Sequence, residues 1–295
     1  MFPRTVVGGV SVSRMIIGTN GFIGCSHATA ARDAFLQRHM DPKKVADILE
    51  VFLNAGVDTI MGHAPIAAEG IQEAQDRTGK KMIVITTPGM PVNPQVPHHP
   101  MVSPQMPVPT DWGLDVDAVA RTLDGEAKGG ATFCLPHQGT TDTLVDRTTH
   151  TIRYMDVIAR MIRERGMIPG LSTHMPESIV YADETNLDVE TYISIYNAAG
   201  FLMPVEADWV MRVISEAKKP VLTIKPLAAG KLLPPVGLAF VWNTIRACDM
   251  VAVGTLSPDE AKEVIELSLD FINRRIPTLQ LQETRSKKAL KQEKK

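Results

Sequence analysis

Cysteine is scarce in this sequence, and its three copies stand far apart. Cys25, Cys134 and Cys248 form no CxxC pair. Single cysteines at such distances argue against a disulfide framework and against a thiolate zinc site. They fit a reducing compartment, and we expect the protein to be cytoplasmic.

Long apolar runs and an excess of one charge are missing too. No stretch approaches the roughly 18 apolar residues of a membrane helix, and the opening MFPRTVVGGVSVSRM lacks the apolar core of a signal peptide. With 31 basic and 33 acidic residues, the net charge of −2 provides no field to attract a polyanion. The basic end of the chain, residues 280–295, is expected to be a flexible, solvated tail. We therefore expect a small-molecule ligand, and neither a nucleic acid nor a membrane as partner.

The sequence does contain a regular alternation of strand-like and helix-like segments. Eight β-rich runs are separated by helical patterns and lie at residues 15–18, 57–61, 82–87, 131–135, 167–172, 192–196, 221–225 and 250–253. Such alternation predicts an α/β fold with a parallel sheet and right-handed crossovers. Eight repeats in about 260 residues favour a closed (β/α)₈ TIM barrel. No GxGxxG follows a strand, which argues against an open dinucleotide-binding sheet.

Capping residues set the expected ends of several helices. Asp41 and Pro42 open a helix over 41–55, as N-cap and first helical residue. A further helix is expected over 148–165, ending at Gly166. Ahead of the first barrel strand, residues 5–14 predict a β-hairpin that turns at Gly8–Gly9 and plugs the barrel floor.

A proline-rich loop interrupts the pattern after the third strand. Residues 88–109 hold eight prolines, and the loop as a whole spans 88–113. A βα loop of this length is usually functional or disordered. A stiff lid or wall over the catalytic face and a passive excursion both remain open. We assign residues 1–279 to one barrel domain.

Four segments resemble one known family. MIPGLSTHMPESI (167–179), IKPLAAGKLL (224–233), VGTLSPDEAKEVIE (253–266) and VSVSRMIIGTNGF (10–22) are similar, in order and spacing, to segments of the aldo-keto reductases. The resemblance covers nearly the whole chain. It implies a barrel with an N-terminal hairpin that uses NAD or NADP as cofactor. It also implies an oxidoreductase acting on a small sugar, polyol or carbonyl compound.

The family's catalytic tetrad of Asp, Tyr, Lys and His is only partly matched. The corresponding positions here hold Met61, Ile66, Pro88 and His137. In the family the tyrosine protonates the carbonyl oxygen, and its pKa is lowered by the lysine. Without these two residues a general acid of matched pKa is missing. We therefore expect an altered mechanism, with His137 orienting the substrate oxygen and His63 supplying the proton.

The resemblance also implies a set of cofactor-binding residues. Ser172 and Thr173 would bind the carboxamide of the nicotinamide, and Tyr196 would lie beside them. A loop poor in bulky residues would approach the phosphates. The phosphate-facing residues expected are Lys225, Pro226, Leu227, Ala228, Gly230, Lys231, Gly254, Thr255 and Ser257. Ser257 and Glu260 also fit a capping box on the last helix, which explains them without a ligand.

Two other functions remain open. His63, His137 and His174 follow three different strands and could together hold a catalytic metal ion, as in a lyase, hydrolase or isomerase. Alternatively, the barrel could be a non-catalytic binding or regulatory protein. His137 on its own could be a loop histidine bonded to backbone, and His174 could cap the next segment.

Overall fold

An antiparallel hairpin opens the fold in the computed structural model, which describes residues 1–62, 65–92 and 113–277. Its strands are β1 (Arg4–Val7) and β2 (Val10–Ser13). Gly8 and Gly9 form the turn with φ of 53° and 83°, values that favour glycine and match a two-residue hairpin. A Cβ on Gly8 would lie 2.7 Å from Ile168 Cγ2, at the start of a barrel strand. The hairpin therefore closes the barrel floor, as predicted.

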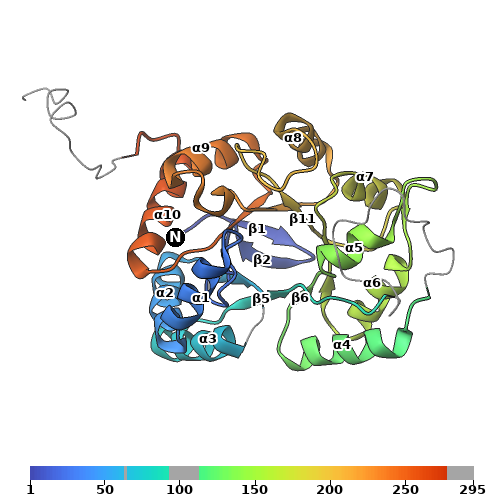
Figure 1. Ribbon diagram of the computed structural model, residues 1–295, viewed down its shortest axis with the longest axis horizontal. Helices are drawn as coiled ribbons and strands as arrows, with labels where there is room; N and C mark the ends of the chain where they lie inside the picture. Colours follow the sequence, from blue (N-terminus) through green and yellow to red (C-terminus); the bar gives the residue numbers. More distant parts are fainter. Residues whose placement is uncertain (63–64, 93–112, 278–295) are drawn as a thin grey trace, which may run out of the picture.

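Parallel strands form a closed barrel around this hairpin (Figure 1). The ladder runs β10-β11-β12-β13-β3-β4-β5-β6-β9. The strands are β3 (Met15–Gly18), β4 (Thr59–Met61), β5 (Ile83–Thr86), β6 (Phe133–Cys134), β9 (Ile168–Pro169), β10 (Leu171–Ser172), β11 (Tyr192–Ile195), β12 (Val221–Ile224) and β13 (Met250–Val253). Each lies within one of the eight runs predicted from the sequence, so the (β/α)₈ barrel is confirmed.

Strands β9 and β10 are two halves of one barrel strand. Ile168 pairs with β6 on one side, whereas Leu171 pairs with β11 on the other. Pro169 has no N–H to give to the β11 side, and the strand is interrupted at Gly170. A Cβ on Gly170 would lie 2.8 Å from the carbonyl oxygen of Thr191, so a larger residue would push the neighbouring chain away.

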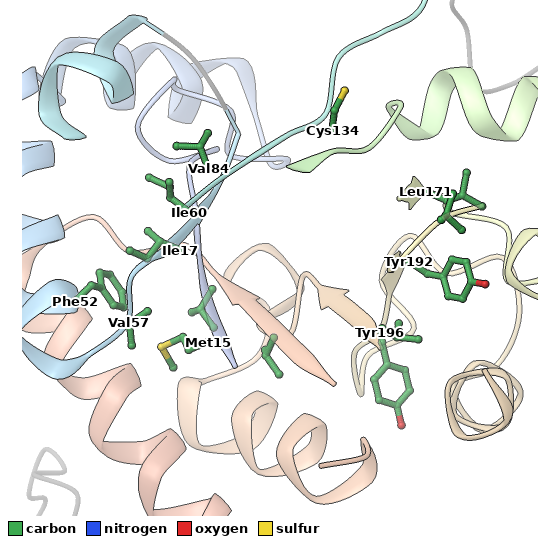
Figure 2. Packing of buried hydrophobic residues seen from close by; sticks show 14 of the residues in the cluster. Met15, Ile17, Phe52, Val57, Ile60, Val84, Cys134, Leu171, Tyr192 and Tyr196 are labelled. Carbon is green, nitrogen blue, oxygen red and sulfur yellow. The ribbon is translucent and has the colours of Figure 1, made fainter. Parts of the chain in front are cut away.

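Side chains alternate between the barrel interior and the surrounding helices. Ile16, Ile85, Phe133, Ile193, Leu222 and Met250 form the inner cluster together with Val7 and Val12 of the hairpin. Residues of the opposite parity, such as Met15, Ile17 and Val251, pack outward against the helices. Figure 2 shows part of this outer layer, where Phe52 of the second helix lies among strand residues. A strand buried on both faces explains the continuous apolar runs.

Helices surround the barrel on the outside (Figure 1). They are α1 (Ala30–His39), α2 (Pro42–Ala55), α3 (Pro65–Thr78), α4 (Val116–Lys128), α5 (Gln138–Leu144), α6 (Met155–Glu164), α7 (Glu177–Glu184), α8 (Ala207–Glu216), α9 (Pro234–Thr244) and α10 (Pro258–Ile272). Asp41 caps α2 by accepting from the Lys44 amide at 2.9 Å, as expected. In the described part of the chain, none of the helices has the length and apolar character needed to cross a membrane.

The helix expected over 148–165 begins later than predicted. A second hairpin, β7 (Val145–Asp146) and β8 (Thr151–Ile152), occupies the start of this segment, and α6 begins only at Met155. The Asp146 carboxylate accepts from the Thr148 amide at 2.9 Å and pairs with Arg153 at 2.6 Å. These contacts fix a turn in which His150 has a φ of 53°. A side chain that binds its own backbone outweighs helix periodicity here.

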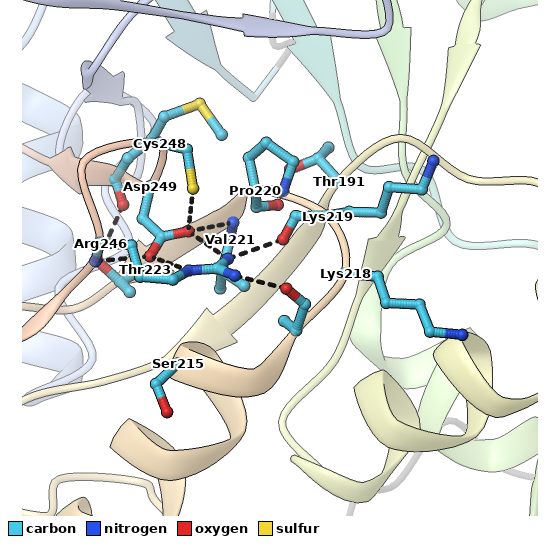
Figure 3. Close-up of polar contacts among 12 residues, drawn as sticks. Thr191, Ser215, Lys218, Lys219, Pro220, Val221, Thr223, Arg246, Cys248 and Asp249 are labelled. Carbon is cyan, nitrogen blue, oxygen red and sulfur yellow. Dashed lines mark hydrogen bonds and ion pairs between the residues drawn. The ribbon is translucent and has the colours of Figure 1, made fainter.

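An ion pair between Arg246 and the buried Asp249 links strands at the floor of the barrel (Figure 3). Arg246 contacts the fully buried Asp249 at 2.7 Å, and the Val221 amide donates to the same carboxylate at 2.8 Å. Arg14 donates to the Asp249 carbonyl at 2.9 Å. The network joins the starts of β3, β12 and β13, at the end of the barrel opposite the carboxyl ends of the strands. Its role is structural.

Two predicted features fall outside the described residues. These are most of the 88–113 loop and the 280–295 tail. At the base of the loop, Val92 and Leu114 form an antiparallel bridge, and the Met90 amide donates to the Thr140 hydroxyl at 2.8 Å.

Candidate functional site

The carboxyl ends of the barrel strands hold a cluster of basic side chains. His174 follows β10, Lys225 follows β12, and His27 lies in the connection from β3 to α1. Barrel enzymes keep their chemistry at this face. Lys225 and His27 are in contact, and the charges of Lys225, His137 and His27 all act on the His174 imidazole.

His174 is half-buried within this cluster. Burial, with the positive charge of Lys225 and the neighbouring His137 and His27, lowers the pKa of His174 to about 4. The imidazole is therefore neutral at pH 7. It does not cap the next helix, because α7 begins at Glu177 with Pro176 as its N-cap.

Lys225 and His27 are in direct contact. Lys225 Nζ lies 3.0 Å from His27 Nε2, and Asn20 Nδ2 lies 2.9 Å from the same nitrogen. Since the amide can only donate, His27 Nε2 is the acceptor and the ring proton is on Nδ1. Burial lowers the pKa of Lys225, and partial burial together with the Lys225 charge lowers the pKa of His27.

The backbone at Lys225 is in the left-handed region, with a φ of 61°. A residue with a Cβ pays roughly 1 kcal/mol or more for this conformation. Ala228, Ala229 and Gly230 also have positive φ, so much of the predicted phosphate loop lies in the left-handed region. Strain of this kind is often found at functional sites.

His137 bonds to the backbone through both its amide and its ring at the end of β6. Its amide donates to the Pro88 carbonyl at 2.9 Å and so joins the ends of β5 and β6. Its Nδ1 accepts from the Gly139 amide at 3.2 Å, which makes His137 the N-cap of α5. When neutral, the ring therefore carries its proton on Nε2. The sequence alternative of a histidine bonded to backbone is correct for this nitrogen.

The predicted metal triad is incomplete among the described residues. His63 lies outside them, and in the ranges that the structure covers no group of three His, Cys, Asp or Glu is arranged to hold a metal ion. Of the three predicted metal ligands, the described residues include His137 and His174 only.

Two of the predicted cofactor residues have other partners. The Thr173 hydroxyl donates to Asp142 at 2.5 Å, and the His174 amide donates to the same carboxylate at 3.1 Å. Tyr196 is fully buried and bonds through its hydroxyl to Thr244 of α9 at 2.9 Å. Its ring is therefore part of the outer core (Figure 2). Ser172 is also buried, at the end of β10.

The amides of the phosphate loop are largely used within the loop. After Lys225, Pro226 and Leu227, a short 3₁₀ turn covers Ala228–Gly230. The Ala228 amide donates to the Lys225 carbonyl at 2.9 Å, and the Gly230 amide to Leu227 at the same distance. Lys231 is exposed, and its ammonium lies 3.7 Å from the centre of the Phe201 ring. Its charge remains available to an anion.

The end of β13 gives mixed evidence for a nucleotide. Gly254 is exposed, and the buried Thr255 hydroxyl has no hydrogen-bond partner among the described residues. A ligand or a water could satisfy this hydroxyl. The N-terminus of α10 is already capped, because Ser257 accepts from Glu260 and Glu260 accepts from the Leu256 amide at 2.7 Å. The Thr255 hydroxyl and the exposed Lys231 ammonium thus fit a nucleotide, whereas the amides of the loop and the acidic helix end do not.

The sequence did not indicate three polar residues of this cluster as site residues: His27, Asn20 and Cys25. They share the segment between β3 and α1, which carries no local motif. The signal that the sequence offers for them is the position of three polar residues in a long βα loop, at the carboxyl ends of the strands.

The comparisons with known proteins bear on the fold. No family model matches the sequence, and no curated protein matches it either. The structure is similar to a protein proposed to be an aldo-keto reductase of Pseudomonas aeruginosa, with a TM-score of 0.61 and 15% identity over 91% of this chain and 95% of that one. It is also similar to a glycerol dehydrogenase of Gluconobacter oxydans, with a TM-score of 0.54 and 14% identity over 95% of this chain and 99% of that one. A third similar structure is an aldose reductase of Giardia lamblia, with a TM-score of 0.52 and 12% identity over 90% of this chain and 94% of that one.

These similarities define the class of fold. The chain is an α/β barrel of the aldo-keto reductase type with an N-terminal hairpin. At sequence identities of 15% or less, these similarities establish the fold and not the function, because one barrel supports many chemistries.

Proposed function

We propose that this chain is a nicotinamide-linked oxidoreductase with an altered catalytic set, acting on a small sugar, polyol or carbonyl compound. The observation that carries the proposal is the basic cluster at the mouth of an aldo-keto-reductase-type barrel. His174, Lys225 and His27 lie where such barrels react, and the pKa of each is lowered.

The residues at the mouth of the barrel would have different catalytic roles. His137 would orient the substrate oxygen through Nε2, since its Nδ1 is held by the Gly139 amide. The proton donor expected from sequence, His63, lies outside the described residues. Lys225 is the described group best suited to share that role, because a lowered pKa brings its acidity closer to neutrality. When bound, the nicotinamide would supply or accept hydride.

The predicted tetrad substitutions support an altered mechanism. Pro88 follows β5, and its carbonyl accepts from the His137 amide; we take this strand end as the one where the family carries lysine. We therefore expect simple aldehydes to be reduced hardly above background.

Calorimetric titration with NADH and NADPH tests the cofactor. We expect micromolar or tighter binding to the full-length protein, with Lys225, Lys231 and Thr255 facing the nucleotide. Thr255→Val removes an unpartnered hydroxyl and keeps the shape of the side chain, so it should weaken binding about 10-fold without loss of stability.

Ser268→Ala is the matched control. Ser268 is also buried with an unpartnered hydroxyl, but it lies in the last part of α10. Its substitution should leave nucleotide affinity unchanged. Absence of heat and of a melting shift at millimolar nucleotide would refute the cofactor and favour the non-catalytic or the metal-dependent alternative.

A further inference from the structure

Lys225 is placed as a nucleophile rather than as a surface lysine. It directly follows β12, is half-buried, and projects from a strand end at the catalytic face. Its neighbour Ile224 packs against the inner barrel cluster, which fixes the backbone beneath it. The left-handed φ of 61° sets the direction of the side chain at an energetic cost.

The surroundings of Lys225 favour the uncharged amine. No ion pair links it to a carboxylate among the residues that the structure describes, whereas His174 and His27 lie nearby. Burial lowers its pKa. A lysine that is desolvated or placed beside other basic groups is the type that forms Schiff bases with carbonyl substrates.

His27 is the group that can take the proton from Lys225. Its Nε2 lies 3.0 Å from Nζ and is an acceptor, as the Asn20 contact at 2.9 Å shows. Because the pKa of His27 is lowered, the imidazole is neutral at pH 7, and its Nε2 lone pair, which Asn20 and Lys225 share, can take up a proton. A base within hydrogen-bond reach of a nucleophile is the arrangement that covalent catalysis needs.

We infer that Lys225 condenses with a small aldehyde or ketone to form an imine, with His27 moving the protons. The Nζ lone pair attacks the carbonyl carbon, so that a C–N bond forms as the C=O π bond breaks. The oxygen takes up the proton that His27 had received from Nζ. A second proton then leaves the nitrogen for the hydroxyl, which departs as water and leaves the imine. No electrons are exchanged, and no other reactant is needed.

This inference goes beyond the proposed oxidoreductase and does not rest on it. Imine formation needs no nucleotide, so it can be tested with none present. Failure of the nucleotide titration would leave it intact, and its own failure would leave the titration result intact.

Reductive trapping is the test. The full-length protein is incubated separately with dihydroxyacetone and with pyruvate in the presence of sodium cyanoborohydride, and the labelled peptides are mapped by mass spectrometry. A trapped lysine gains the mass of the carbonyl compound less one oxygen atom. We expect Lys225 to be labelled at least 10-fold faster than the exposed Lys43 of α2 and Lys262 of α10. The neutral and the anionic probe together show whether the basic cluster prefers a carboxylate.

Two variants separate the roles of the side chains. Lys225→Arg keeps the charge and should abolish labelling at this position. His27→Gln should slow labelling of Lys225 about 10-fold, whereas His39→Gln in α1 should not. The internal comparison with Lys43 and Lys262 needs no variant, so it remains decisive if Lys225→Arg fails to fold. Labelling of Lys225 no faster than that of the two exposed lysines, with both probes, would overturn the inference.

Discussion

The backbone amide of His174 donates a hydrogen bond of 3.1 Å to the Asp142 carboxylate. The pKa values of the two side chains are nevertheless shifted in opposite directions. Burial raises the pKa of Asp142 to about 6, although hydrogen bonds from Thr173 and His174 act against this rise. Burial and Lys225 lower the pKa of His174 to about 4. Near pH 5 both side chains are therefore neutral at the same time.

Asp142→Asn should change how stability depends on pH. A carboxyl whose pKa is raised on folding contributes stability below its unfolded pKa of about 4, and loses it as pH rises through about 6. The asparagine oxygen can still accept from Thr173 and His174 but does not titrate. The wild type should therefore lose stability relative to the variant between pH 4 and pH 7, as measured by urea unfolding.

His174 contributes with the opposite sign. A lowered pKa gives stability above about 6.5 that is lost as pH falls towards 4. Because both proteins keep His174, its contribution cancels in the difference. A difference that does not vary with pH would contradict the raised pKa of Asp142.

His137 offers a test that separates catalysis from capping. His137→Ala removes both the Nε2–H and the cap on Gly139, whereas His137→Ser can still cap α5. We expect either variant to lower activity about 100-fold or more, the usual scale for a positioned acid or base. Only the alanine variant should also lose about 1 kcal/mol of stability. If serine restores activity together with stability, His137 acts only as a cap.

Much of the barrel could be predicted because burial on both strand faces leaves a clear mark in sequence. The runs MIIG and MVAV have no alternation, and both become strands with one face toward the hairpin and one toward the helices. The segment before Met155 could not be predicted in this way. There the Asp146 carboxylate decides the structure through contacts with the Thr148 amide and Arg153, and helix periodicity carries no information about such contacts.

The site was only partly predictable, for a similar reason. Family resemblance drew attention to Lys225 as part of a phosphate loop, but its contact with His27 joins residues far apart in the chain. Tyr196, named from the resemblance as a cofactor residue, is buried and bonds through its hydroxyl to Thr244 of α9. These residues are 48 positions apart, and no local pattern indicates their contact.

Asp249 should be the most sensitive polar residue of the barrel floor. Its carboxylate is fully buried and neutralises Arg246, so Asp249→Ala would leave a half-buried cation without its partner. We expect a loss of about 3–5 kcal/mol in the free energy of unfolding, measured with urea. Glu216→Gln in the exposed pair with Arg212 is the control and should change stability by less than about 1 kcal/mol. Similar losses in the two variants would show that burial does not govern these pairs.

Glu260 should have opposite effects on stability and on nucleotide binding. Its carboxylate accepts from the Leu256 amide at 2.7 Å in the first turn of α10, close to where this barrel type would bring a phosphate. Glu260→Gln keeps an oxygen acceptor and removes the negative charge. The helix dipole then loses a favourable partner, which should cost about 0.5 kcal/mol in urea unfolding.

The same substitution should strengthen nucleotide binding several-fold in calorimetry, because a phosphate would no longer meet a carboxylate. The gain should shrink as salt is added, since the repulsion is near the surface and is screened. Glu263→Gln, also exposed on α10 but further along the helix, is the matched control and should change affinity little. If both variants leave affinity unaltered while nucleotide binds, the phosphates do not approach α10. The loop from Lys225 to Lys231 would then have to hold them alone.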